Sequence, residues 1–232
     1  YLSFILLFIA SFGFILFFIR TIFRPNNKFP AFDKFIISLF LSSIILCLIS
    51  STIFHIFCCY SEYVSKTLNK IDYVGITVLI VGSSIPWIYY NFQNRNNLKT
   101  TYLTIVVVIG IICFVFSCFE WLSLPAFRNI RTGMFLALGL SGFLPNLHHL
   151  WLEKVTKEEI KNQYSWLGLM AIAYLLGTFC YAKKIPEKYF PGKCNILFQS
   201  HQIFHMCVIL GAIFHTINTM SMVDAKLKEL SK

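Results

Sequence analysis

Hydrophobic positions in this chain fall into seven long runs, separated by short polar stretches rich in Lys, Asn and Pro. An apolar run of about 18 to 25 residues is long enough to cross the hydrocarbon core of a bilayer as a helix. Only a helix satisfies every backbone polar group inside such a run. The pattern therefore predicts seven membrane-spanning helices, at about residues 1–23, 35–60, 73–92, 101–122, 132–151, 164–181 and 199–223.

The polar breaks and the chain ends complete this outline. Pro25 follows the first run and ends its helix, whereas Pro86 lies inside the third run and is expected to kink it. Residues 224–232 read as a polar C-terminal tail. The chain starts at Tyr1, in the middle of an apolar run and without Met, so we expect that the native N-terminal region is missing.

Composition supports a membrane protein. Hydrophobic residues make up 57% of the chain and charged residues only 13%, whereas a soluble domain carries about 25% charged residues. The formal net charge of +10 is spread over loops on both sides of the helices, so we expect contacts with lipid headgroups and no binding of nucleic acid. The eight cysteines show no paired CxxC spacing and are expected to be free thiols. The fold class is thus an all-α membrane protein, a seven-transmembrane helix bundle.

Two histidines near the start of the last run could share one metal ion. His201 and His205 are four residues apart and so lie one turn apart on one face of a helix. Catalytic zinc usually has three protein ligands and a water molecule, so a third ligand must come from elsewhere. Gln202 occupies the place of the glutamate base in the zinc-protease pattern H-E-x-x-H, so the base must also come from elsewhere.

Helix topology suggests where these groups are. In an alternating seven-helix chain, the end of the second run and the starts of the third and seventh lie at the same membrane face. These ends carry Ser51, His55, Asp72, His201 and His205. We predict that His55, His201 and His205 bind Zn²⁺ with water as the fourth ligand. Asp72 would orient or deprotonate this water, and Ser51 would hydrogen-bond the water, a ligand nitrogen or a developing oxyanion.

Each residue also has a simpler interpretation. His55 alone would be an interfacial polar residue, Asp72 alone a helix N-cap, and a histidine pair four apart also arises by chance. The remaining histidines do not join the group. His148 and His149 adjoin a loop at the opposite face, and His215 follows His205 by about 15 Å along the helix.

Several segments resemble the adiponectin receptors of the progestin and adipoQ receptor family. The combined pattern is S-x-x-x-H, then Asp, then H-x-x-x-H, which is more specific than either histidine pair alone. The segments that carry the resemblance are residues 51–55, 70–76, 86–90, 139–142, 184–193 and 198–205.

The resemblance implies a receptor of inverted topology relative to G-protein-coupled receptors. Its N-terminus would be cytoplasmic and its C-terminus extracellular, most simply in the plasma membrane. By position, His55, His201 and His205 match the family's zinc ligands, Asp72 matches the carboxylate near the zinc-bound water, and Ser51 matches the accompanying serine. The family's receptors answer to adiponectin-like hormones or progestins, and the adiponectin branch is associated with hydrolysis of ceramide to sphingosine and free fatty acid.

Two functions from different classes follow. The first is a zinc-dependent amide hydrolase, a ceramidase, that acts on ceramide-like membrane lipids within lipid-metabolism signalling. The alternative is a non-enzymatic receptor in which the zinc is structural and clamps helices. A role in zinc balance or transport is a third possibility, which would require more charged residues along a pathway. Small residues on the fifth run, such as Gly133 and Gly139, would also allow a homodimer.

Overall fold

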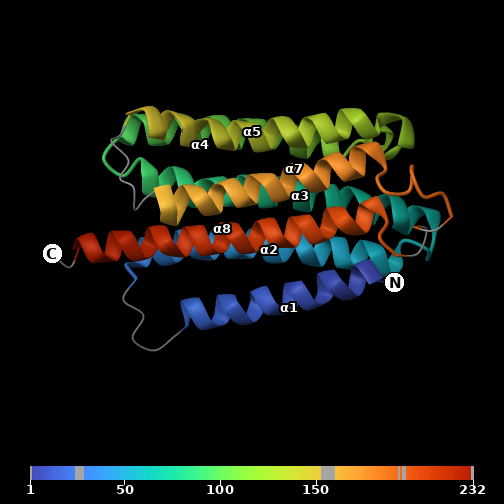
Figure 1. Cartoon of the computed structure of the whole chain (residues 1–232), viewed down its shortest axis with the longest axis horizontal. Helices are drawn as coiled ribbons and strands as arrows, with labels where there is room; N and C mark the ends of the chain where they lie inside the picture. The colour runs from blue at the N-terminus through green and yellow to red at the C-terminus, as the bar shows by residue number, and fades with distance from the viewer. Residues whose placement is uncertain (1, 24–28, 153–159, 193, 195–196, 231–232) are drawn as a thin grey trace.

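The computed structural model describes residues 2–23, 29–152, 160–192, 194 and 197–230. The described chain forms a bundle of seven long helices and contains no strand, which confirms the predicted fold class (Figure 1). Short 3-10 turns η1 (Glu120–Ser123) and η2 (Pro125–Phe127) precede α5, and a short π-helix η3 (Ile160–Tyr164) precedes α7. The long helices are α1 (Leu2–Ile22), α2 (Ala31–Phe57), α3 (Glu62–Asn91), α4 (Asn96–Ser117), α5 (Arg128–Leu152), α7 (Ser165–Lys183) and α8 (Ser200–Leu230).

Six of the seven helices are long and apolar enough to cross a membrane by themselves. The seventh, α5, is as long but carries Arg128, Arg131 and His148 among its apolar residues. The helices run roughly along one axis, and α1 begins at the end of the bundle opposite to that where α8 ends (Figure 1). This arrangement is that of an integral membrane protein.

The core of the bundle lies between α2, α3 and α8. Phe40 and Ile44 of α2 are fully buried, and Leu79 of α3 and Ala212 of α8 belong to the same cluster. Outward-facing side chains are apolar too, as expected where lipid replaces water. Ile9 on α1, for example, is 64% exposed. The core thus holds α2, α3 and α8 together, and these three helices supply the predicted site residues.

Glycines allow α3 to approach its neighbours closely. A Cβ at Gly75 would overlap the side chain of Ser50 on α2, and one at Gly142 of α5 would overlap the Ser84 hydroxyl on α3. Such small-residue contacts are typical of membrane helices. Gly133 and Gly139, by contrast, have open space where a Cβ would lie.

The third helix starts earlier than the hydropathy pattern suggested, at Glu62 instead of residue 73. Ser61 caps it by accepting a hydrogen bond from the Val64 backbone N–H (3.2 Å), and Glu62 pairs with Lys66 one turn later (2.6 Å). Apolar runs alone miss such a polar first part of a helix. Asp72 therefore lies well inside α3, and its interpretation as an N-cap is wrong.

The last helix continues past residue 223, because α8 extends to Leu230. Most of the expected polar tail is thus helical, and residues 231–232 lie outside the described chain. Lys226 on this extension forms an ion pair with Asp33 at the start of α2 (2.8 Å) and donates to the Tyr89 hydroxyl of α3 (3.1 Å). Asp33 is only 2% exposed. A buried ionic contact therefore joins α2, α3 and α8 at one end of the bundle.

Candidate metal centre

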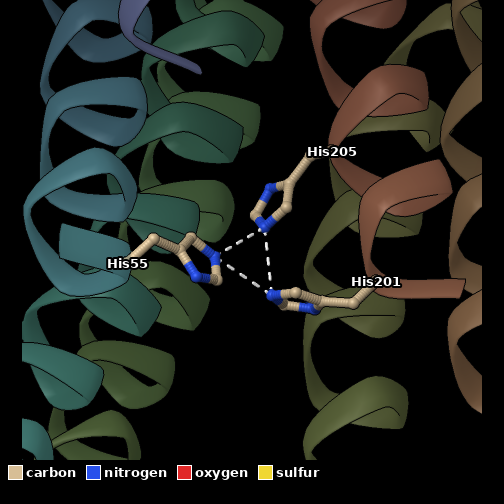
Figure 2. A group of neighbouring side chains, drawn as sticks. All are labelled: His55, His201 and His205. Atoms are coloured by element: carbon tan, nitrogen blue, oxygen red, sulfur yellow. Dashed lines mark hydrogen bonds between the residues drawn. The ribbon is translucent and has the colours of Figure 1, made fainter. Parts of the chain in front are cut away.

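Three histidine rings meet at the opposite end of the bundle. His55 comes from the last turns of α2, and His201 and His205 come from the first turns of α8. Their Nε2 atoms form a nearly equilateral triangle, with separations of 3.0 Å between His55 and His205 and 3.1 Å for the other two pairs. Figure 2 shows the three rings pointing toward a common centre. The three side chains lie close enough to hold one metal ion.

The geometry of this triangle suits a metal ion better than hydrogen bonds between the rings. Each imidazole directs the lone pair or the N–H of Nε2 along the ring axis, toward the same centre. Three protons in that space would collide, whereas three lone pairs can share one cation. A tetrahedral zinc ion with bonds of about 2.0–2.1 Å separates its nitrogen ligands by about 3.3 Å. The observed separations of 3.0–3.1 Å lie close to that value.

A glutamate in the loop before α8 fixes the start of this helix. Both the backbone N–H and the hydroxyl of Ser200 donate to Glu187 Oε1, each over 2.8 Å. Partial burial by itself would raise the pKa of Glu187, but the hydrogen bonds from its own backbone and from Ser200 outweigh it, so the pKa lies below 4.5. Since His201 directly follows Ser200, this cap also fixes the first turn of the helix that carries two of the three rings.

Ser51 and Asp72 lie in the same cavity as the histidines of α8. The cavity has a volume of about 310 Å³, and Ser51, Asp72, His201 and His205 line one end of it. Ser51 is 3% and Asp72 6% exposed. The buried Ser51 hydroxyl forms no hydrogen bond of standard geometry within the described residues, but it lies close enough to the Asp72 carboxylate to interact with it. The two groups are therefore neighbours in the cavity lining. The Asp72 carboxylate does not join the described group of converging ligand atoms.

Arg131 lines this cavity as well, although it lies just outside the fifth run as predicted from the sequence, which begins at about residue 132. It lies in the first turn of α5 and is 5% exposed. Its guanidinium donates to the Leu122 carbonyl (2.6 Å) and to the Tyr181 hydroxyl (2.8 Å), and it lies over the Tyr73 ring at 4.8 Å. Because the Tyr181 ring also contacts His201, Arg131 brings a buried positive charge close to the metal centre. In the sequence, the only sign of this buried position is that Arg131 directly precedes a predicted helical run.

The other three histidines lie apart from the triangle, as the topology predicted. His148 of α5 bonds Tyr102, and its neighbour His149 bonds Tyr164 near the start of α7. His215 lies deeper along α8 and bonds the backbone of α3. The cysteines are free thiols, as predicted, and Cys58 is not part of the described group of ligand atoms.

Comparisons with known proteins agree with the resemblance found in the sequence. The haemolysin-III-related family matches residues 2–216. The chain is 43% identical over 206 residues to progestin and adipoQ receptor-like protein 1 of Caenorhabditis elegans, covering 89% of this chain and 48% of that protein. It is 39% identical over 223 residues to the adiponectin receptor protein of Drosophila melanogaster, covering 95% of this chain and 50% of that protein.

A plant protein shares the same region. Heptahelical transmembrane protein 4 of Arabidopsis thaliana is 35% identical over 197 residues, which cover 84% of this chain and 49% of that protein. The chain thus spans about half the length of these relatives. The family match covers nearly all of the chain and includes every predicted site residue. The chain therefore belongs to the haemolysin-III-related family and is similar to its adiponectin receptor-like members.

Proposed function

We propose that this protein is an adiponectin receptor-like membrane protein whose metal centre binds zinc and hydrolyses ceramide-like lipids to sphingosine and free fatty acid. The observation that carries the proposal is the joint position of three groups. A triangle of histidine nitrogens, a buried carboxylate and the hydroxyl beside that carboxylate lie at one end of a cavity inside a membrane bundle. This combination is typical of metal-assisted hydrolysis.

Each residue would have a defined part in the reaction. His55, His201 and His205 would hold the ion, which, when bound, lowers the pKa of a coordinated water to about 7 and polarises a carbonyl oxygen. Asp72 would accept a proton from the attacking water and return it to the amide nitrogen as the C–N bond breaks. The Ser51 hydroxyl would donate a hydrogen bond to the oxygen on which negative charge develops. Arg131 would attract the carboxylate of the released fatty acid.

The depth of the site suits a lipid substrate. His55 lies near the end of α2 and His201 at the start of α8, so the metal centre lies near one face of the membrane. An amide at the level of the headgroups reaches that depth while its acyl chains stay between helices. With the N-terminus in the cytoplasm and the C-terminus outside, as we propose for a plasma-membrane receptor, the metal centre would face the cytoplasm.

The sites that we propose for binding partners are consistent with this orientation in the membrane. An adiponectin-like protein hormone would act from the face opposite the metal centre. A homodimer would use the open positions at Gly133 and Gly139 on α5, where a second helix has room to approach.

One observation favours a second function, a receptor in which zinc is structural. The three ligands come from α2 and α8, so a bound ion would cross-link the two helices. Such a clamp needs three histidines but no carboxylate directed at a water molecule. The role of Asp72 therefore separates the two functions.

Asp72→Asn tests this difference. In a hydrolase the amide cannot accept the proton, so we expect ceramide turnover to fall at least a hundredfold, with zinc content and thermal stability nearly unchanged. Zinc is measured by mass spectrometry of the purified protein, and turnover by the release of sphingosine. Asp224→Asn, an exposed carboxylate on α8, is the matched control. Turnover that Asp72→Asn leaves unchanged would eliminate the role of Asp72 as proton acceptor, whereas a protein that binds zinc but releases no sphingosine would favour structural zinc.

A further inference from the structure

The cavity at the metal centre has a second polar end. From Ser51 and Asp72 it continues between apolar side chains to His215 on α8 and Asn146 on α5. His215 follows His205 by ten residues, which corresponds to about 15 Å along the helix. Both His215 and Asn146 are 3% exposed. Polar side chains so deep in a membrane bundle are costly and generally have a function.

The contacts of His215 leave one nitrogen without a partner. Its Nε2 lies 2.8 Å from the backbone carbonyl oxygen of Ser83 on α3, so this nitrogen carries a proton and donates it. In the neutral ring, Nδ1 is then an acceptor. It is buried and has no hydrogen-bond partner among the described residues.

Asn146, which lines the same cavity, carries a second free acceptor. Its amide nitrogen donates to the Gly142 carbonyl (3.2 Å), while its Oδ1 is buried without a partner in the described chain. The hydroxyls of Ser83 and Ser84 on the cavity wall do not supply a donor, because both donate to the Ile80 carbonyl (2.9 and 2.8 Å). Two buried acceptors without a partner in the described chain therefore belong to residues that line this cavity, and the hydroxyls of Ser83 and Ser84 already donate elsewhere.

We propose that this deep end is a subsite for a hydroxyl group on a lipid chain whose polar head lies at the metal centre. A hydroxyl can donate to one of the acceptors, whereas a plain methylene or methyl group would leave both unsatisfied, which costs free energy. A charged ammonium group would be unfavourable at this depth. The inference rests on the proposed function and narrows its substrate class to hydroxylated lipids.

The length of the cavity defines the position of the hydroxyl. An extended alkyl chain advances about 1.3 Å per carbon, so about 15 Å corresponds to about twelve carbons. The preferred chain would thus carry its hydroxyl about twelve carbons from the carbonyl at the metal centre. A hydroxyl next to the carbonyl would not reach His215 or Asn146.

A competition experiment tests this subsite without cleavage of any bond. The full chain, reconstituted in lipid nanodiscs, is loaded with a fluorescent fatty acid, which is displaced by stearic, 12-hydroxystearic or 2-hydroxystearic acid. We expect 12-hydroxystearic acid to bind about fivefold more tightly than the other two, as one additional hydrogen bond would give.

Two variants remove the acceptors separately. His215→Phe keeps a flat ring but loses both nitrogens, and Asn146→Leu keeps a similar size but loses the amide. Each single variant leaves one acceptor for the hydroxyl, so the double variant is the decisive one. It should reduce the preference for 12-hydroxystearic acid to less than twofold while stearic acid still binds. His148→Phe, the same substitution at a histidine outside the cavity lining, is the matched control and should keep the preference.

The outcomes separate this subsite from the proposed function. Equal affinity for all three acids, as expected if water alone satisfies the acceptors, would overturn the subsite, and so would a preference that survives the double variant. Because the assay involves no hydrolysis, a protein that does not cleave ceramide would still show the preference. Conversely, loss of the preference would leave a positive turnover result intact.

Discussion

His201 and His205 lie one turn apart on α8, so a single helix supplies two of the three rings. The third ring, from α2, cannot hold an ion alone. Metal binding at this centre is thus a property of side chains from two helices whose ring nitrogens lie 3.0–3.1 Å apart.

Zinc content tests the triangle directly. The purified protein should contain about one zinc ion per chain, and the double variant His201→Ala with His205→Ala should contain almost none, because one imidazole is too few ligands. Mass spectrometry gives the metal content. The control is the same change at two histidines outside the triangle, His148→Ala with His149→Ala, which should keep the zinc. Equal zinc in both double variants would place the metal elsewhere.

Among the elements, α8 depends on a contact from outside the helix. Its first two turns hold two of the predicted metal ligands, and Glu187 satisfies the Ser200 backbone N–H at the first turn. Unsatisfied N–H groups at a helix start destabilise it. The loop before α8 therefore stabilises the metal centre although no residue of the loop belongs to the triangle.

Glu187→Ala should lower the stability of the protein by about 1 kcal/mol, as expected for a lost cap. The pKa of Glu187 lies below its usual value of 4.5, so the contribution of the carboxylate is complete above that pH. It is lost as the pH falls through the lowered pKa. The melting temperatures of the protein and the variant should thus differ at pH 7 and converge in more acidic buffer. Glu62→Ala, which removes an exposed carboxylate at the start of α3, should show a smaller difference at pH 7.

At the scale of the whole molecule, the bundle has polar contacts at both ends. The histidine triangle joins α2 and α8 at one end, and Asp33 and Lys226 join the same helices at the other. Asp33 is buried, whereas Lys226 is partly exposed. Loss of one partner leaves the other charge without compensation.

Asp33→Asn should therefore destabilise the protein by about 3 kcal/mol, which corresponds to a fall of about 6 to 12 °C in melting temperature. The double variant Asp33→Asn with Lys226→Met should lose less than the sum of the two single variants, because the second change removes the uncompensated charge. Thermal unfolding in detergent measures all three. Strict additivity would show that the ion pair contributes nothing of its own.

Much of this architecture could be predicted from the sequence, because apolar runs of bilayer length have only one regular structure available to them. The alternation of helix directions also predicted that His55, His201 and His205 lie close together. Polar helical extensions could not be predicted in that way. The start of α3 depends on the Ser61 cap, and the end of α8 depends on the Lys226 ion pair. A hydropathy pattern reveals neither of these polar contacts. The burial of Arg131 likewise depends on partners far away in the sequence, such as Tyr181.

The two contacts between α2 and α8 also define how this molecule can move. Asp33 and His55 are about 33 Å apart along α2, and His205 and Lys226 about 32 Å apart along α8, since each residue advances a helix by about 1.5 Å. With metal bound, two helices of matched span would be fastened near both membrane surfaces and would rotate or tilt as one body. A change of shape that begins at the end of the bundle opposite the metal centre would then reach that centre through rigid motion of this pair, while the other helices rearrange around it.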